Sequence, residues 1–258
     1  MTPRAIVRSV VERISRRVVL RRRLPREYGG HRIYVSPDAS LRFWRRDLRS
    51  ADPFLFDICA ELVADGDVVW DVGANVGLFA LAAACRASES GAVLAVEPDP
   101  FLVRLLRRSS HGLPAPSAPV EVLHAAVSDR QGIATFTIAS RSRAASHLAS
   151  VDGSSQAGGV RDTVEVVTVT LDDLLVTRRA PAILKIDVEG AELLCLQGAT
   201  RLLSTARPVI LSEVAGRNSA AVERLLRQFD YTLQDASVPK PARTRLDFAP
   251  WNTLAFPA

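Results

Sequence analysis

From residue 68 onward the chain alternates apolar strands with helices, and this alternation constrains the fold more than any other feature of the sequence. Strands are expected at 68–71, 93–98, 120–127, 183–187, 209–213, 231–233 and 253–256. Helices are expected at 53–63, 77–87, 100–109, 192–203 and 220–229. Such a pattern forms a mostly parallel sheet with helices on both faces, and its ligands bind at the carboxyl ends of the strands. The predicted fold class is therefore α/β, with the functional residues at strand ends.

One stretch interrupts the alternation. Residues 133–163 contain no helical pattern, alternate like a strand at 133–138, and become rich in Ser and Gly after residue 146. A further strand is expected at 164–169. We interpret 133–163 as a polar insertion that covers a substrate pocket, within a single domain spanning residues 28–258.

The segment before this domain carries most of the positive charge. The first 49 residues hold 14 Arg and four acids, whereas the remainder holds 19 basic and 24 acidic residues. Residues 4–23 are typical of a basic amphipathic helix, because Val7, Val10, Val11, Ile14 and Val18 recur at helical spacing. Three interpretations stay open for this segment, 1–27: a helix docked on the protein, a helix lying on an anionic membrane surface, or a nucleic-acid-binding or targeting segment.

The compartment and the partners follow from composition. No apolar run approaches the roughly 20 residues of a membrane-spanning helix. Three cysteines without a CxxC spacing suggest neither a disulfide framework nor a zinc site. We expect a cytoplasmic protein with possible peripheral membrane contact through residues 4–23. Because residues 50–258, the larger part of the chain, carry a net negative charge, we expect no nucleic-acid partner.

The first strand runs into the turn Asp71-Val-Gly-Ala-Asn-Val-Gly77. Gly73 and Gly77 remove side chains where a ligand or the backbone comes close, and Asn75 tolerates a left-handed conformation. A dinucleotide fingerprint requires G-x-G-x-x-G. Counted from Gly73, the positions of the second and third glycines of that motif are occupied by Asn75 and Leu78. A nicotinamide-dependent oxidoreductase is therefore disfavoured.

The turn carries a carboxylate, Asp71, which suits a ligand with a cationic end, such as the ammonium and sulfonium of S-adenosylmethionine. The next strand ends in Glu97, 26 residues later. An acidic side chain at that strand end accepts hydrogen bonds from ribose hydroxyls. A turn and an acid at this spacing together indicate a nucleoside-containing, cationic ligand.

The later strands add further charged residues. Lys185 and Asp187 are two residues apart on a strand and so point to one face, where Glu189 joins them if the strand continues. Glu213 ends the adjacent strand, so Asp71, Asp187 and Glu213 are expected to converge on one crevice. Three carboxylates also resemble a divalent-metal site, so Mg²⁺ is a possible but unassigned cofactor. A structural ion pair between Lys185 and Asp187 is the alternative.

Several segments together resemble the FkbM-type family of S-adenosylmethionine-dependent methyltransferases. They are DVGANVG (71–77), AVEPDP (95–100), VEVLHAAVSDRQG (120–132), VTLDDLL (169–175), ILKIDVEGAELLCLQGA (183–199) and PVILSEV (208–214). The resemblance implies a Rossmann-like class I methyltransferase fold whose seven-stranded sheet has an antiparallel last strand, and usually O-methylation of a hydroxyl. It also implies that Asp71, Gly73, Asn75 and Gly77 line the methionine part of the cofactor and Glu97 its ribose. Ser128 and Asp129 would flank the adenine.

The sequence thus predicts an O-methyltransferase that acts on a hydroxyl of a sugar, glycolipid or secondary metabolite. Methyl transfer depends mainly on positioning and desolvation, but a hydroxyl acceptor must lose a proton. We expect Lys185, Asp187 and Glu213 around the acceptor, with Asp187 touching the cofactor and Glu213 or a metal assisting deprotonation. The alternative is a catalytically silent cofactor-binding or scaffold protein at a membrane surface.

Overall fold

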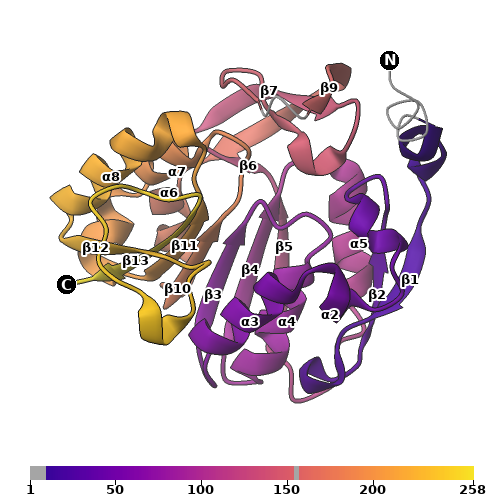
Figure 1. The fold of residues 1–258 in the computed structure, drawn as a ribbon, viewed down its shortest axis with the longest axis horizontal. Coiled ribbons are helices and arrows are strands. Elements are labelled where there is room, and N and C mark those ends of the chain that lie inside the picture. Colours follow the sequence, from indigo (N-terminus) through magenta and orange to yellow (C-terminus); the bar gives the residue numbers. More distant parts are fainter. Residues whose placement is uncertain (1–9, 154–156) are drawn as a thin grey trace.

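Seven strands form the central sheet in a computed structural model that describes residues 10–153 and 157–258 (Figure 1). In spatial order they are β12 (Tyr231–Asp235), β13 (Asn252–Pro257), β11 (Val209–Glu213), β10 (Ile183–Ile186), β3 (Val68–Val72), β4 (Ala92–Glu97) and β5 (Val120–His124). β13 runs antiparallel to both of its neighbours, whereas the pairings among β11, β10, β3, β4 and β5 are parallel. The predicted fold class and its antiparallel last strand are confirmed.

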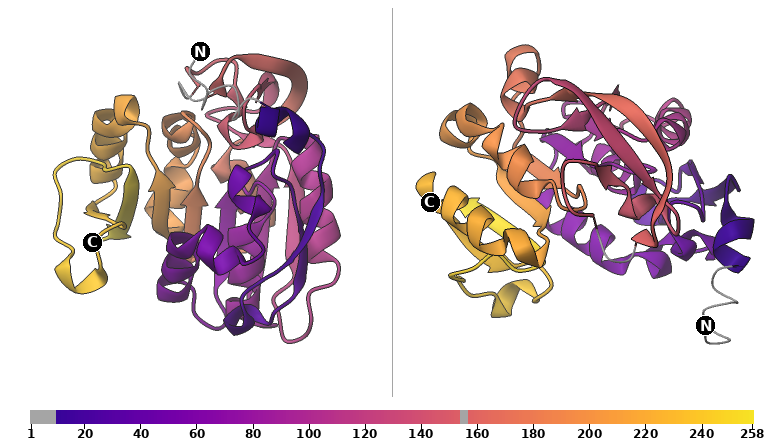
Figure 2. Two further views of the ribbon diagram at one scale, coloured as in Figure 1. Left: turned by 45° about the vertical axis from the view of Figure 1, so that its right-hand side comes forward. Right: turned by 90° about the horizontal axis from the view of Figure 1, so that it is seen from above.

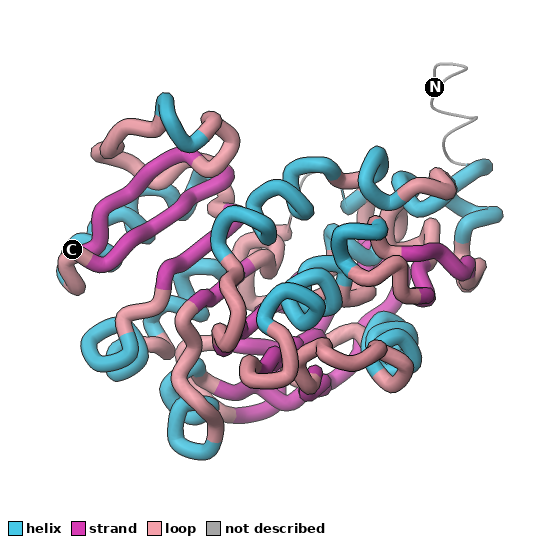
Figure 3. The backbone as a smooth tube through the Cα atoms, turned by 90° about the horizontal axis from the view of Figure 1, so that it is seen from below, coloured by secondary structure: helices cyan, strands magenta, loops and turns pink. Residues whose placement is uncertain are grey.

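Helices cover both faces of this sheet, and Figure 3 shows the strands between them. The main helices are α2 (Leu48–Ala51), α3 (Pro53–Leu62), α4 (Leu78–Ala87), α5 (Pro100–Ser110), α6 (Leu171–Thr177), α7 (Glu192–Gln197) and α8 (Ser219–Gln228). Helical turns complete the set: η1 (Arg26–Tyr28), η2 (Leu41–Trp44), η3 (Arg143–Ala145), η5 (Leu202–Ala206), η6 (Gly216–Asn218) and η7 (Lys240–Ala242). The helix expected at 192–203 is therefore two shorter pieces, α7 and η5.

The alternation of side chains along β3 explains the two cores. Val69 packs with residues of α3, α4 and α5 on one face, and Trp70 and Val72 pack with α7 and α8 on the other. Because successive side chains of a strand point to opposite faces, Asp71 shares the face of Val69. It thus enters a buried, apolar layer at the carboxyl end of the strand.

The predicted insertion forms a second sheet. Its strands are β6 (Ala126–Val127), β7 (Gly132–Ala139), β8 (His147–Leu148) and β9 (Val160–Val169), in the order β6-β9-β7-β8. The strand expected at 120–127 divides at residue 125, and its second part joins this sheet instead of continuing the first. Figure 2 shows the second sheet above the strand ends of the central one. Residues 154–156 of the insertion lie outside the described part.

The N-terminal segment differs from its prediction. Residues 10–15 are helical, but Leu20–Arg23 form β1, which pairs antiparallel with β2 (Arg32–Val35). The expected helix at 4–23 is therefore wrong in its second half, because pairing with β2 outweighs the helical spacing of the valines. Residues 4–9 lie outside the described residues. The domain boundary expected at residue 27 lies between β1 and β2, which pair with each other.

Within the described chain, no helix is both long and apolar enough to cross a membrane.

Candidate active site

The turn after β3 brings the tips of two strands together. Gly73 has φ +77°, and a Cβ on it would lie 1.8 Å from the carbonyl oxygen of Asp187, at the tip of β10. Only glycine fits this close approach. Asn75 has φ +55°, as predicted for a left-handed position. Gly77 then begins α4, and a Cβ there would overlap Leu106 of α5.

Glu97, at the tip of β4, is bound to the same turn. Its two carboxylate oxygens accept hydrogen bonds from the backbone N–H groups of Asn75 and Asp99, at 2.7 and 2.8 Å. Burial raises the pKa of Glu97 to about 8. Hydroxyl donors from a bound ribose would favour the ionised form of this carboxyl.

Lys185 joins the strand tips electrostatically. Its Nζ donates to Asp71 Oδ1 at 3.1 Å and to Asp187 Oδ2 at 3.4 Å. Burial opposes the ammonium, but the carboxylates of Asp71, Asp187 and Glu213 raise the pKa of Lys185 above its ordinary value. The second carboxylate oxygen of Asp71 accepts from the backbone N–H of Ala80, at 3.1 Å. Asp71 is thus fully engaged inside the protein, and the ion pair weighed as an alternative is present.

A cavity of about 230 Å³ lies over these strand tips. The predicted cofactor residues on its wall are Asp71, Gly73, Asn75, Glu97 and Asp187. Ser128 and Asp129 are not among its lining residues, because the chain turns away after β5, and Ala125, Ala126 and Val127 face the cavity instead. Gly77 is the N-cap of α4 and not a wall residue.

These residues fit S-adenosylmethionine in chemistry. Glycine and left-handed asparagine open the turn, an acid stands at the tip of β4 where the ribose was expected, and Asp187 remains partly exposed beside Lys185, as a cationic end would require. Val127 and Phe136 supply apolar wall for a base.

A second, larger cavity of about 650 Å³ adjoins the first. The two share a set of wall residues at the tips of β10 and β11: Lys185, Asp187, Glu189 and Glu213. Much of the rest of the second cavity comes from distant segments, including Phe54, Arg141 and Trp251, and Arg42 lines both cavities. We call this shared wall the junction. The three predicted catalytic residues, Lys185, Asp187 and Glu213, thus lie where the two cavities meet.

Glu213 and Glu189 are the two glutamates of the junction. The charge of Asp187 and burial raise the pKa of Glu213 to about 7. The strand does not continue to Glu189, because β10 ends at Ile186 and Glu189 has φ +48°, so the condition for Glu189 to share the face of Lys185 is not met. Within residues 10–153 and 157–258, no three His, Cys, Asp or Glu side chains are grouped as a metal site. The possible divalent metal therefore has no defined ligand set.

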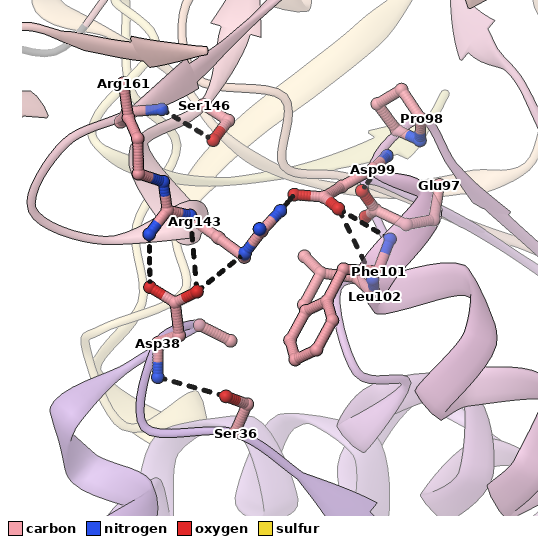
Figure 4. Close-up of polar contacts among 12 residues, drawn as sticks. Ser36, Asp38, Glu97, Pro98, Asp99, Phe101, Leu102, Arg143, Ser146 and Arg161 are labelled. Atoms are coloured by element: carbon pink, nitrogen blue, oxygen red, sulfur yellow. Dashed lines mark hydrogen bonds and ion pairs between the residues drawn. The ribbon is translucent and has the colours of Figure 1, made fainter. Parts of the chain in front are cut away.

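An ion-pair network ties the insertion to the cofactor side (Figure 4). Arg143 donates to Asp38 at 2.8 Å and to Asp99 at 2.5 Å, while Arg161 donates to both oxygens of Asp38. The guanidinium of Arg143 also lies 4.7 Å from the ring centre of Phe101. Burial favours neutral Asp38, but the hydrogen bonds from Arg161 and Arg143 lower its pKa.

Sequence reasoning missed this network, which we call the Arg143 network (Asp38, Asp99, Arg143 and Arg161). Arg143 is 105 residues from Asp38 and 44 from Asp99 in the chain, so no local spacing relates them. The signal present in the sequence was weak: three arginines (Arg141, Arg143 and Arg161) in an otherwise Ser- and Gly-rich insertion.

Comparison of the sequence with known proteins points to one family. The model of the methyltransferase FkbM domain matches residues 71–233. The hexuronic acid methyltransferase AglP of Haloferax volcanii is 29% identical over 205 residues, which cover 78% of this chain and 79% of AglP. Among solved structures, methyltransferase FkbM from Methylobacillus flagellatus is 16% identical with a TM-score of 0.45, over 78% of this chain but 50% of that one. Aeropyrum pernix fibrillarin, with natively bound S-adenosyl-L-methionine, is 12% identical with a TM-score of 0.43, over 76% of this chain and 68% of that one.

Proposed function

The chain belongs to the FkbM family of S-adenosylmethionine-dependent methyltransferases, and we propose that it methylates a hydroxyl of a sugar acid. The sugar-acid class rests on the relative AglP, whose name describes a hexuronic acid methyltransferase. The acceptor is a free sugar acid, or one held in a glycan or glycolipid.

The shared wall of the two cavities is the observation that carries this proposal. A methyl donor in the smaller cavity and an acceptor in the larger one would meet at Lys185, Asp187 and Glu213. Bringing two reactants together in a fixed orientation supplies much of the rate of a displacement. The remaining task of the junction is to manage the acceptor's proton.

The larger cavity has groups suited to a sugar acid. Trp251 lies on the wall of this cavity and is 57% exposed. Its aromatic ring could therefore serve as a platform for a sugar ring. Arg141 is on the wall too, and its guanidinium has no hydrogen bond or ion pair with any described residue. Arg42 is paired with Asp52 at 3.0 Å. Arg141 is thus the cation with free donors, and a guanidinium binds a carboxylate bidentately.

The roles at the junction follow from charge and burial. S-adenosylmethionine, when bound, supplies an electrophilic methyl group. Lys185 is a positioning residue: it stays protonated and holds Asp71 and Asp187 in fixed orientations. Asp187 faces the cationic end of the cofactor. Glu213, whose pKa is near neutrality, assists removal of the acceptor's proton.

We further propose a cytoplasmic enzyme that touches membranes through its N-terminal segment. All three cysteines are free thiols, in keeping with a reducing compartment. On the short helix at 10–15, Val10 and Ile14 are 51% and 63% exposed. Replacing both by Ser in the full chain should reduce co-sedimentation with anionic vesicles, and unchanged co-sedimentation would remove this proposal. The catalytic domain is proposed to begin at β1, since that strand pairs with β2.

The experiment that tests the proposed function is a transfer assay with methyl-labelled S-adenosylmethionine. Glucuronic and galacturonic acid, free and as glycosides, are compared with glucose and galactose. We expect label in the sugar acids and at least tenfold less in the neutral sugars. Cofactor binding without transfer to any sugar acid would contradict the proposal.

A further inference from the structure

The turn between β10 and α7 presents a glutamate that has no role so far. Glu189 lines both cavities, together with Asp187 and Glu213. Its φ of +48° belongs to the left-handed region, which is uncommon for a residue other than Gly, Asn or Asp. A backbone held there is enforced by its surroundings, and such positions cluster at functional sites.

The surroundings that enforce this turn can be named. The carboxylate of Glu192 accepts from the backbone N–H of Gly190 at 2.5 Å and from Asn218 Nδ2 at 2.8 Å. Asn218 Nδ2 also donates to the carbonyl of Gly190 at 2.9 Å. On the other side, the carbonyl of Asp187 packs against Gly73. The turn is thus fixed at both ends, and Glu189 lies between the fixed points.

The acids around the junction differ in their partners. Asp187 is paired with Lys185, and both oxygens of Glu192 are used by the turn. The carboxyl groups of Glu189 and Glu213 have no hydrogen bond or ion pair with the described residues. Two carboxyl groups without partners therefore face the space in which donor and acceptor would meet.

We propose that Glu189 is a second catalytic carboxyl of this enzyme, which acts with Glu213 as one proton-accepting pair. The inference rests on the proposed function, since it assigns the base for that reaction. As the acceptor's O–H bond breaks, its electron pair forms the bond from oxygen to the methyl carbon. The carbon–sulfur bond breaks with its electron pair on sulfur, which becomes a neutral thioether. The proton passes to the carboxylate pair and then to water.

The charged groups that face the pair support this role. Burial and the charges of Asp187, Glu213 and Glu192 raise the pKa of Glu189 to about 8, against the opposing charge of Arg217. The pKa of Glu213, about 7, is raised by Asp187, burial and Asp52, and is opposed by Lys185 and Arg42. Because the charge of Glu213 is among those that act on Glu189, we expect the two groups to titrate together. Near neutrality the pair holds one proton and offers one carboxylate, which is the state a general base requires.

The first test compares Glu189→Gln with the wild-type enzyme on an acceptor that the wild type methylates. We expect kcat to fall by about 100-fold, in the usual range for loss of a general base, with the cofactor dissociation constant changed less than twofold. Glu213→Gln removes a negative charge facing Glu189 and should move the rising limb of kcat/KM to lower pH. Wild-type kcat and an unchanged pH profile in Glu189→Gln would overturn the inference.

A matched control separates the carboxyl from the backbone conformation. Asp230 is also an acid in the left-handed region, at φ +57°, but is exposed and lines neither cavity. Asp230→Asn should leave kcat unchanged. Glu189→Gly relieves the conformation without restoring the carboxyl, so it should be as slow as Glu189→Gln. Recovery of kcat in Glu189→Gly would assign Glu189 a structural role and overturn the inference.

A titration tests the inference without any acceptor. Carbon-13 NMR of the wild type labelled at the glutamate carboxyls, assigned with Glu189→Gln and Glu213→Gln, should show two coupled resonances that titrate between about pH 7 and 8. Titration of Glu189 below pH 5 would overturn the inference. If the wild type methylates no sugar acid, the proposed function fails, and the titration still shows whether Glu189 and Glu213 form a coupled pair.

Discussion

The two cavities differ in where their key residues come from. The predicted cofactor residues of the smaller one lie at three neighbouring strand tips, β3, β4 and β10, within three positions of a strand end, and parts of residues 40–55 and of the insertion complete its wall. The larger one takes its walls from segments as far apart as Arg42, Arg141 and Trp251. The cofactor residues are thus placed by local backbone geometry, whereas the acceptor side depends on how distant segments pack. We therefore expect changes at Arg141 or Trp251, which line only the larger cavity, to affect the acceptor more than the cofactor.

The sharpest way to break the cofactor side is Gly73→Ala. The new Cβ would overlap the carbonyl of Asp187, and φ +77° is unfavourable for alanine. We expect cofactor affinity to fall more than 100-fold, or the protein to fail to fold. Gly29→Ala is the matched control, because Gly29 has φ +75° with nothing within 4 Å of the added Cβ. It should cost only about 1–2 kcal/mol of stability. Equal melting temperatures and equal cofactor binding in the two variants would contradict the close approach.

The Arg143 network, which ties the insertion to the cofactor side, is broken by Arg143→Met. Asp99 would lose its guanidinium partner and Asp38 would keep only Arg161. Leaving a buried charge without its partner typically costs about 3 kcal/mol or more, so we expect a loss of that size in urea unfolding. Arg178→Met removes the exposed pair with Glu121 and should cost less than about 1 kcal/mol. If both variants lost the same stability, the Arg143 network would not hold the insertion in place.

The acceptor side alone is tested by Arg141→Ala and Trp251→Ala. Each should raise KM for a sugar acid about tenfold, equivalent to about 1.4 kcal/mol, and leave KM for the cofactor within twofold. Phe248→Ala is the control, since Phe248 is an exposed aromatic residue that lines neither cavity. A parallel rise in both KM values would mean that the two sides are not separable.

An effect of similar size, about tenfold, is expected from pH on the cofactor side. Because burial raises the pKa of Glu97 to about 8, its carboxyl is mostly protonated at pH 7. Ribose hydroxyls donate to the ionised form, so the dissociation constant for S-adenosylmethionine should fall about tenfold from pH 7 to pH 9 and level off above the pKa. In Glu97→Gln this dependence should disappear in calorimetry. If the dissociation constant of the wild type did not change with pH, Glu97 would not be the residue that binds the ribose.

The contrast between the two sides also explains what the sequence could predict. Asp71, Asn75 and Glu97 could be placed at strand tips because strand periodicity and turn chemistry act over a few residues. Ser128 and Asp129 lie off the cavity wall because β5 ends at His124 and the chain then joins the second sheet, a choice made by pairing with β9. The helix at 4–23 failed in the same way, through pairing of β1 with β2.

The acceptor side escaped prediction for a related reason. Arg141 and Trp251 gain their positions only when the insertion and the C-terminal strands fold over the central sheet. Glu189 would have shared the strand face of Lys185 only if the strand continued to it, but its left-handed backbone puts it in a turn. Tertiary packing determines these positions, so neither the periodicity of the sequence nor the spacing of its motifs predicts them.

The central claim is that donor and acceptor meet at the junction of Lys185, Asp187 and Glu213. A crystal structure with S-adenosylhomocysteine and a hexuronic acid tests it most directly. We expect the cofactor product over Gly73 and Glu97, one sugar hydroxyl at the junction facing the sulfur, and the sugar carboxylate at Arg141. A sugar acid bound away from the larger cavity, or a cofactor product outside the smaller one, would contradict the claim.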